Sequence, residues 1–304
     1  MNTESDAMHG SPFESQRTAP TISTTRPLYW SVRRELWENR SIYIAPLVVA
    51  ALVLFGFLIA TIGRAVATAD PVRKAAVFAE QNSFAELLIM GTMLIVAVLY
   101  CLDALHGERS DRSILFWKSL PVSDLTTVLS KASIPIVLLP LFTFAVTLAT
   151  QWIMLLLSAA VMVASGLSPE TLWTQLSLAR ISQLLFHLLA IHGLYFAPIY
   201  AWLLLVSAWA RRAAFLWAGL PLLAIGVVEK IAFNTTHFVA MLGNRLSGDE
   251  TPSYPVPDGA AMHHQLTLLT LGRFLVSPGL WIGLIVAAAF LFAAVRMRRS
   301  RGPI

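Results

Sequence analysis

Long apolar runs separated by short polar segments dominate the pattern along this chain. Six runs are long enough to cross the hydrocarbon layer of a membrane, which is about 30 Å thick and takes roughly 20 helical residues. They cover approximately residues 41–62, 84–105, 134–164, 181–209, 213–233 and 274–295. The third and fourth runs exceed that length, so we expect them to tilt or to project from the membrane. The pattern predicts an all-α membrane protein with six transmembrane helices.

The segment before the first run has the pattern of a helix at a membrane surface. At 100° per residue, residues 28–40 (LYWSVRRELWENR) divide into an apolar arc and a polar arc. The apolar arc holds Leu28, Tyr29, Trp30, Val32, Leu36 and Trp37, and the polar arc holds Ser31, Arg34, Glu35 and Glu38. Such a composition favours an N-terminal interfacial helix. A cytoplasmic extension of the first span is an equally good interpretation.

Residues 1–27 are polar and rich in Ser, Thr and Pro, so we expect a disordered tail there and one membrane domain over residues 28–304. The whole chain is 57% hydrophobic and only 13% charged. Soluble domains average about 25% charged residues, so lipid is the expected main solvent. The net charge of +5 does not indicate nucleic-acid binding, because the basic residues cluster at the ends of apolar runs. The single cysteine, Cys101, can form no intrachain disulfide.

Lysine and arginine positions predict how the chain is oriented. Most of the 22 basic residues fall in the N-terminal segment, the loop after the second span, the loop after the fourth span and the C-terminal tail. These four segments are therefore expected on the cytoplasmic side. Both termini are then cytoplasmic, as an even number of spans requires. We expect a multi-pass protein of the bacterial inner (plasma) membrane.

The loop after the second span carries the sequence DALHGERSDRSILFWKSLPVSD at residues 103–124. Its centre holds five large apolar residues, namely Ile114, Leu115, Phe116, Trp117 and Leu120. Aromatic residues ringed by Arg and Lys are typical of protein–protein hot spots. Pro121 followed by the capping types Ser123 and Asp124 predicts that a short helix ends and the helix of the third span begins soon after. We interpret the short helix as a docking helix for a cytoplasmic partner; a helix lying flat on the inner leaflet is the alternative.

The run ERSDRSILFWKSLPVSD, after a span ending in YCLDAL, resembles the first cytoplasmic loop of type-two ABC permeases, the membrane subunits of ABC exporters. The tail, the interfacial helix, six spans, a tight hairpin at residues 210–213 and a larger external loop before the last span are compatible with that family. The resemblance implies that residues 108–121 form the coupling helix, which sits in a groove of the ATP-binding subunit. It implies polar contacts to that subunit from Glu108, Arg109, Asp111 and Arg112, and an anchor formed by Phe116, Trp117, Lys118 and Leu120.

ATP itself must be bound elsewhere. A phosphate-binding loop needs a Gly-Lys pair, and the sequence contains none. We therefore expect neither a catalytic residue nor a cofactor in this chain, and a separate ABC ATP-binding subunit as its partner. The resemblance also implies a second permease copy or a related permease chain, and leaves open whether the pair is a homodimer or a heterodimer. The transported substrate stays open between amphipathic or lipophilic cargo and ions.

Residues 234–272 form the predicted external loop, either a lid over the exit or an ordinary loop. Its histidines, His237, His263 and His264, lack a carboxylate or cysteine at useful spacing, so we expect no metal site. Gln151, Gln183, His187 and His192 lie at membrane depth, and Glu229 and Lys230 near the outer end of the fifth span.

Polar residues at membrane depth are functional hypotheses by default. His187 and His192 are five residues apart, about 140° around an α-helix, so we expect them on different faces, each in a helix–helix hydrogen bond. Glu86 is expected at the end of its span, without a buried partner. An ion-coupled secondary transporter or an intramembrane enzyme is the alternative function. The first would bury acids at midspan and the second would pair catalytic groups at one depth; we find neither pattern in the sequence.

Overall fold

The computed structural model describes residues 25–65, 71–115, 122–164, 181, 184–247 and 275–300. Within these ranges every regular element is a helix. Five helices are long and apolar enough to cross a membrane, or six if one bent pair counts as a single span. The predicted all-helical membrane fold is confirmed at this level, whereas the orientation of the termini stays a prediction. The predicted tail, residues 1–27, lies almost entirely outside the described residues.

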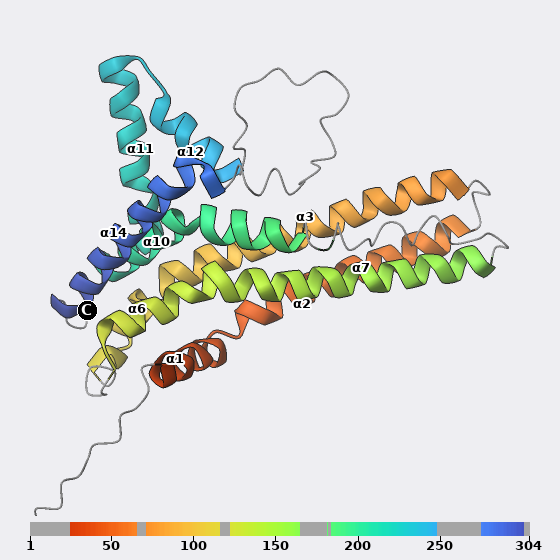
Figure 1. The fold of residues 1–304 in the computed structure, drawn as a ribbon, viewed down its shortest axis with the longest axis horizontal. Coiled ribbons are helices and arrows are strands. Elements are labelled where there is room, and N and C mark those ends of the chain that lie inside the picture. Colours follow the sequence, from red (N-terminus) through yellow and green to blue (C-terminus); the bar gives the residue numbers. More distant parts are fainter. Residues whose placement is uncertain are drawn as a thin grey trace, which may run out of the picture.

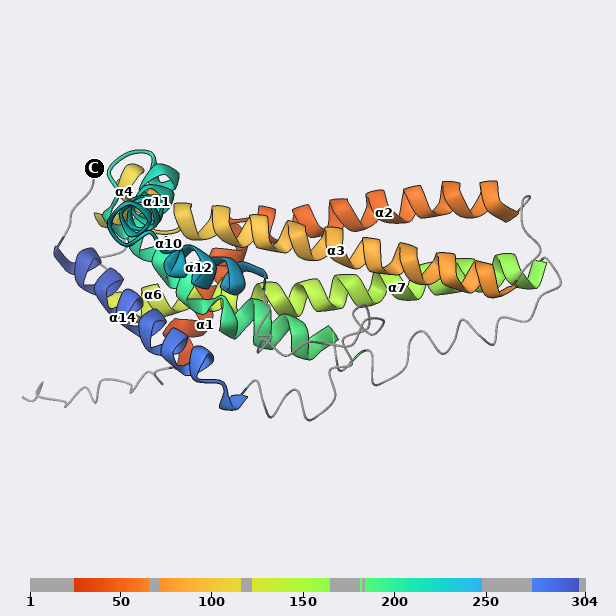
Figure 2. The ribbon, with the colours of Figure 1, turned by 90° about the horizontal axis from the view of Figure 1, so that it is seen from above.

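Three long helices lie side by side and form the elongated part of the molecule (Figures 1 and 2). They are α2 (Ser41–Ala65), α3 (Pro71–Asp103) and α7 (Leu139–Ala164). Their shared interior is apolar and holds Phe57, Ala85, Met154, Leu155, Ala159 and Met162. The outer faces of these helices are apolar too, as expected where lipid is the solvent. The α3 helix begins well before the predicted start of its span at residue 84.

The third span belongs to one continuous helix of 41 residues, Asp124–Ala164. It consists of α6 (Asp124–Ser133), the π-helical segment η1 (Ile134–Leu138) and α7. Ser123 is the N-cap, since its Oγ accepts a hydrogen bond from the backbone N–H of Thr126 at 3.1 Å. The predicted helix start at Ser123 and Asp124 is confirmed. Pro135 lacks an N–H and crowds the preceding turn, which explains the wider helix at η1.

The fourth span is bent. It consists of the π-helical segment η3 (His187–Tyr195), preceded by one turn from Leu184, and α10 (Ala197–Trp209), which meet at an angle of 44°. Gly193 lies against η1, where a Cβ atom would stand 2.5 Å from the carbonyl oxygen of Ile136. Only glycine allows the two π-helical segments to approach this closely.

The C-terminal helix α14 (Pro278–Ser300) packs along α10 through the small residues Ala197, Ala201 and Ala287. Two shorter helices, α1 (Thr25–Glu38) and α4 (His106–Ser110), lie at the end of the bundle where α6 begins and α14 finishes (Figure 1). We call this the basal end.

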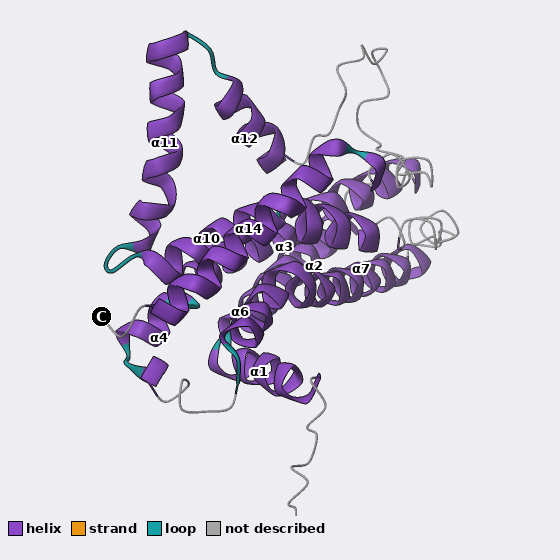
Figure 3. Ribbon diagram, turned by 60° about the vertical axis from the view of Figure 1, so that its left-hand side comes forward, coloured by secondary structure: helices purple, strands orange, loops and turns teal. Residues whose placement is uncertain are grey.

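The α11 helix projects from the bundle, and α12 runs back toward the bundle from its far end (Figure 3). Arg245 of α12 donates hydrogen bonds to the carbonyls of Tyr195 at 3.0 Å and Gly279 at 3.3 Å, so α12 contacts the bundle. A tight turn at residues 210–213, with Ala213 in the left-handed region at φ 49°, leads into α11 (Ala214–Phe233), so the predicted hairpin is confirmed. Large apolar side chains on α11 are exposed, among them Leu223 and Ile231. The chain then turns at Asn234 into α12 (His237–Ser247), which lies within the predicted external loop.

Candidate functional site at the basal end

The α1 helix presents one face to the bundle and another away from it. Val32 and Leu36 pack against the main apolar core, and Glu35 between them in the helix turn is only 2% exposed. Trp30 and Trp37 are instead 59% and 70% exposed. The predicted apolar arc is therefore divided between two environments, and Glu35, predicted on the polar arc, is buried. The reason is a set of charged partners that approach α1 from distant parts of the chain.

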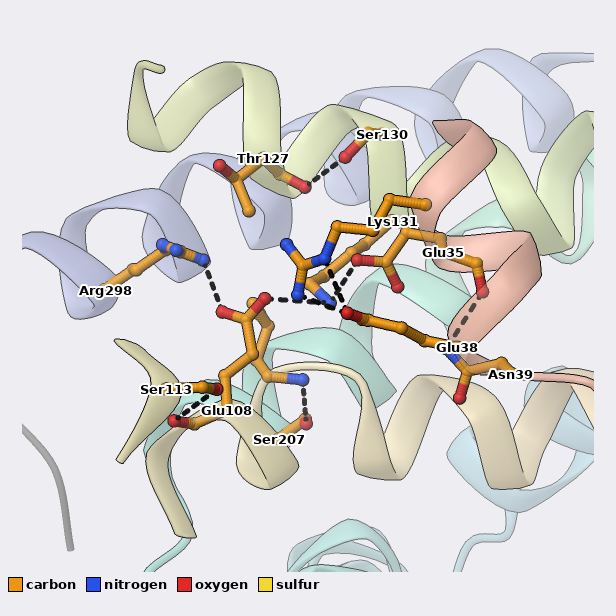
Figure 4. Close-up of polar contacts among 12 residues, drawn as sticks. Glu35, Glu38, Asn39, Glu108, Ser113, Thr127, Ser130, Lys131, Ser207 and Arg298 are labelled. Atoms are coloured by element: carbon orange, nitrogen blue, oxygen red, sulfur yellow. Dashed lines mark hydrogen bonds and ion pairs between the residues drawn. The ribbon is translucent and has the colours of Figure 1, made fainter. Parts of the chain in front are cut away.

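Those partners form a buried ionic cluster, defined by Glu35, Glu108, Asp124, Lys131 and Arg298. Figure 4 shows all of these residues except Asp124. The Nζ of Lys131 donates a hydrogen bond to Oε1 of Glu35 at 2.8 Å and lies 3.2 Å from Oε1 of Glu108. The other oxygen of Glu35 accepts a hydrogen bond from the Tyr100 hydroxyl at 3.0 Å. Lys131 thus holds two carboxylates from α1 and α4 together.

Arg298 completes the cluster from α14. Its Nη1 donates to Oε2 of Glu108 at 2.9 Å, and its Nε donates to Oδ1 of Asp124 at 3.0 Å. The side chains of Arg298, Glu108 and Lys131 are all less than 8% exposed. Four helices from three separate parts of the sequence, α1, α4 with α6, and α14, are therefore joined by one set of charges. Removing one partner from such a buried set leaves an uncompensated charge, which is strongly destabilising.

The short helix α4 is also fixed to the end of α10. The hydroxyl of buried Ser207 accepts hydrogen bonds from the backbone N–H groups of Leu105 at 3.0 Å and His106 at 2.8 Å. The guanidinium of Arg109 donates to the carbonyls of Ala208 at 2.8 Å and Ala210 at 3.3 Å. These carbonyls belong to the last turn of a helix, where a cation is favourable. The first part of the 103–124 loop is thus a rigid extension of the bundle.

The predicted docking residues consequently divide into three groups. Glu108 and Arg109 point into the bundle and are engaged within the chain. Asp111 and Arg112 are exposed, and Arg112 adopts a left-handed conformation at φ 58°. Phe116, Trp117, Lys118 and Leu120 lie outside the described residues.

The residues around the predicted anchor alternate in exposure. Ile114 is 2% exposed, whereas Leu115 next to it is 59% exposed. The loop therefore has an inner side bound to the bundle and an outer side that the described residues do not cover.

The histidine pair in the fourth span differs from the prediction. The ring centroids of His187 and His192 are 5.1 Å apart, so the two side chains share a face. The prediction assumed an α-helix, but η3 is a π-helix with i→i+5 hydrogen bonds, in which residues five apart are neighbours. The predicted helix–helix hydrogen bond is also missing at Nδ1 of His192, which has no hydrogen-bond partner in the described part of the chain.

Two carboxylates in the spans have partners that the sequence did not indicate. Glu86 lies near the start of the candidate span Glu80–Ser110, as expected, but Nε2 of Gln151 lies 3.5 Å from its Oε2. Glu229 accepts hydrogen bonds from the backbone N–H groups of His237 at 2.7 Å and Phe238 at 2.9 Å, so it caps the N-terminus of α12. Gln183, His263 and His264 lie outside the described residues.

Among the residues that the structure describes, no group of three or more His, Cys, Asp or Glu side chains is arranged to hold a metal ion. The basal end is held together by the ion pairs and hydrogen bonds described above.

The ionic cluster was not predicted, because its members are separated by 96 residues (Glu35 and Lys131) and 190 residues (Glu108 and Arg298). The sequence contains one indication of the buried position of Glu35. This residue lies three positions after Val32 and directly before Leu36, and these two apolar residues pack against the main core. Comparisons with protein-family models, with curated proteins and with solved structures find no match to the chain.

Proposed function

We propose that this chain is the membrane-spanning subunit of an ATP-driven exporter of the type-two ABC family. In this proposal the basal end is cytoplasmic and the chain lies in a bacterial inner membrane. The 108–121 segment couples it to a separate ATP-binding subunit, and a second permease copy or a related chain completes the pathway.

The division of the 103–124 loop into two sides carries the proposal. A coupling element must be fixed to the spans on one side and present contacts to the motor on the other. Glu108 and Arg109 supply the fixed side, through the ionic cluster and through the end of α10. Asp111, Arg112 and Leu115 are available on the outer side. Closure of an ATPase dimer against that side would move α4 and, through Lys131 and Arg298, the helices α1, α6 and α14 together.

Site-specific photo-crosslinking in native membranes tests the docking. A photoreactive phenylalanine analogue at Trp117 is expected to crosslink the chain to a polypeptide with a phosphate-binding loop, identified by mass spectrometry. The same analogue at Arg211, an exposed position on the neighbouring turn between α10 and α11, is the control and is expected to give no such product. Adducts with lipid alone at Trp117 would overturn the proposal in favour of a helix lying flat on the leaflet.

Charge reversal gives the quantitative version of that test. Arg112→Glu is expected to reduce co-purification of the ATPase at least about tenfold, the effect of losing 1.4 kcal/mol of binding free energy. Trp117→Ala should act in the same direction. Arg211→Glu changes the charge equally and should retain the ATPase. Alkaline extraction, in which all three variants must stay in the membrane, separates loss of docking from loss of insertion.

A second candidate function, an ion-coupled transporter, is favoured by two observations. Glu86 is a carboxylate near the start of the candidate span Glu80–Ser110 with Gln151 as its partner, and the His187–His192 pair lies in a bent span. Ionisable groups and broken helices at membrane depth are typical of ion pathways. If this candidate is correct, the purified chain alone moves protons or Na⁺ into liposomes without nucleotide, and Glu86→Gln abolishes the flux. ATP-driven export predicts no flux from the chain alone.

A further inference from the structure

The outward face of α1 carries a stripe of aromatic and basic side chains, defined by Trp30, Arg33 and Trp37. These residues are spaced by three and four, so they share one face of the helix. The guanidinium carbon of Arg33 lies 5.3 Å from the ring centroids of both tryptophans. The cation therefore rests between two indole rings on an exposed surface. Tyr29, which is 60% exposed, packs edge-on against Trp30 and extends the stripe.

The rest of α1 fixes the direction in which this stripe points. Glu35 is held in the ionic cluster by Lys131 and Tyr100, and Leu36 packs on the core, so the helix cannot roll about its axis. The stripe is thereby held away from the bundle, next to the start of α2. The α1 helix lies at the basal end of the bundle, beside α6 (Figure 1).

Exposed tryptophans beside a cation have a preferred environment. Trp and Tyr favour the boundary between headgroups and acyl chains, where the ring is apolar on one side and its N–H or O–H stays wet. A guanidinium stacked on indole faces keeps its N–H groups in its own plane, directed outward, and this fork matches phosphate oxygens. Among the side chains that the structure describes, Arg33 has no ion-pair partner, whereas its neighbour Arg34 is paired with Glu38 at 2.7 Å.

We propose that the Trp30–Arg33–Trp37 stripe binds the phosphate of an anionic phospholipid headgroup, with the indole rings inserted between the adjacent lipids. Charge complementarity favours this occupant: the stripe carries a positive charge that no described side chain neutralises, and anionic leaflets attract such charges at the membrane surface. A protein partner would need an acidic, aromatic-accepting surface at the depth of the headgroups. The inference does not depend on whether the chain is an exporter subunit or an ion-coupled carrier.

Native mass spectrometry of the purified full chain, titrated with phosphatidylglycerol in a neutral detergent, measures this binding. Arg33→Gln is expected to raise the apparent Kd for the tightest phosphatidylglycerol by about fivefold, the contribution of one basic residue at an anionic surface. Arg34→Gln is the matched control: it removes the same charge from the adjacent residue and should leave Kd within about twofold of wild type. Phosphatidylcholine should bind both variants and wild type alike.

Three results would overturn the proposal. One is an equal rise in Kd for Arg33→Gln and Arg34→Gln, which would reduce the effect to net charge. Another is complete competition by inorganic phosphate, which would make the site a soluble-anion site. The third is a change in the dimer-to-monomer ratio of Arg33→Gln in lipid-free detergent, which would make the stripe an interface between copies. An unchanged thermal unfolding midpoint for Arg33→Gln in neutral detergent confirms that the variant is folded.

Discussion

Lys131 is the residue through which the basal end is joined, since its single ammonium group lies within 3.2 Å of carboxylates from two other helices. Burial excludes water as a substitute partner, so the electrostatic cost of losing this cation falls on Glu35 and Glu108 together. Arg298 satisfies only the second of these carboxylates. Glu35 therefore depends on Lys131 as its cation within the cluster.

Lys131→Met, which keeps the length and apolar stem of the side chain, is expected to lower the free energy of unfolding by about 3–5 kcal/mol. The physical reason is that Glu35 and Glu108 remain buried without their shared cation. Thermal unfolding in detergent, followed by near-ultraviolet circular dichroism, measures the loss. Arg34→Ala removes an exposed ion pair from α1 and should cost at most about 1 kcal/mol. Equal effects of the two substitutions would contradict the importance of the cluster.

Local residue patterns predicted some of these roles and missed others. Ser123 was recognised as a cap because a capping residue bonds within three residues of itself. Helical periodicity predicted Glu35 on the polar arc because periodicity reports only on nearby residues. It cannot reveal that Lys131, 96 residues further along the chain, approaches Glu35 in the fold. The exposed Asp111 and Arg112 were expected to be polar surface contacts, and their use by a partner stays a prediction.

At the scale of elements, the two π-helical segments η1 and η3 shape the centre of the bundle. They pack against each other where Gly193 meets the carbonyl of Ile136. The wider turns place His187 beside His192 and precede the bend into α10. This contact is between the backbone of one segment and the backbone of the other, so it leaves no room for a side chain.

Gly193→Ala is therefore expected to destabilise the protein by about 1–3 kcal/mol, because the new methyl group must displace η3 from η1. Gly56→Ala is the matched control in α2, where a Cβ atom would meet nothing within 4 Å. That substitution should leave stability unchanged or slightly raised, since alanine favours a helix. The midpoints of thermal unfolding of both variants in the same detergent decide the matter; a stable Gly193→Ala variant would refute the close contact.

The existence of the elements was predictable, whereas their irregularities were not. Runs of about 20 apolar residues identify membrane helices because the hydrocarbon thickness is fixed. Departures to a π-helix depend on how two segments fit together in space. The sequence showed Pro135 and Gly193 but not that Gly193 lies against Ile136, the residue next to that proline. The extension of α3 before residue 84 and the helix α12 within the external loop were likewise not predicted.

At the scale of the whole molecule, the orientation of the chain decides how its surfaces are used. The chain has a single cysteine, Cys101, which is fully buried in α3. Replacing it with alanine gives a background in which an introduced cysteine reports its side of the membrane. The positive charges predict that the 103–124 loop is cytoplasmic and the loop before the last span is external.

In that background, Asp258→Cys is expected to react with a membrane-impermeant maleimide added to intact spheroplasts. Asp111→Cys, on the basal end, should react only after permeabilisation, because the reagent cannot cross the bilayer. The fraction of each variant labelled, read by gel shift, measures the topology. Labelling of Asp111→Cys from outside would reverse the orientation and remove access of an ATPase to the 108–121 segment.

Composition predicted the class of molecule well, since a chain this poor in charge needs lipid as its solvent. The projection of α11 from the bundle and the return of α12 to it could not be predicted, because apolar periodicity does not tell a lipid-facing surface from a protein-facing one. The exposed apolar side chains of α11 are ordinary in a bilayer.

The uninterrupted helix from Asp124 to Ala164 has 41 residues and is about 60 Å long, twice the thickness of the hydrocarbon layer. A rod of this kind resists compression, so pushing on one tip either shifts the far tip by a similar distance or flexes the rod. Flexing costs least at η1, where the regular hydrogen-bond ladder is already altered. A displacement at Asp124 is therefore transmitted to the opposite surface of the bilayer along one continuous helix. The helix bends most easily at η1, and no chain of side-chain contacts is needed.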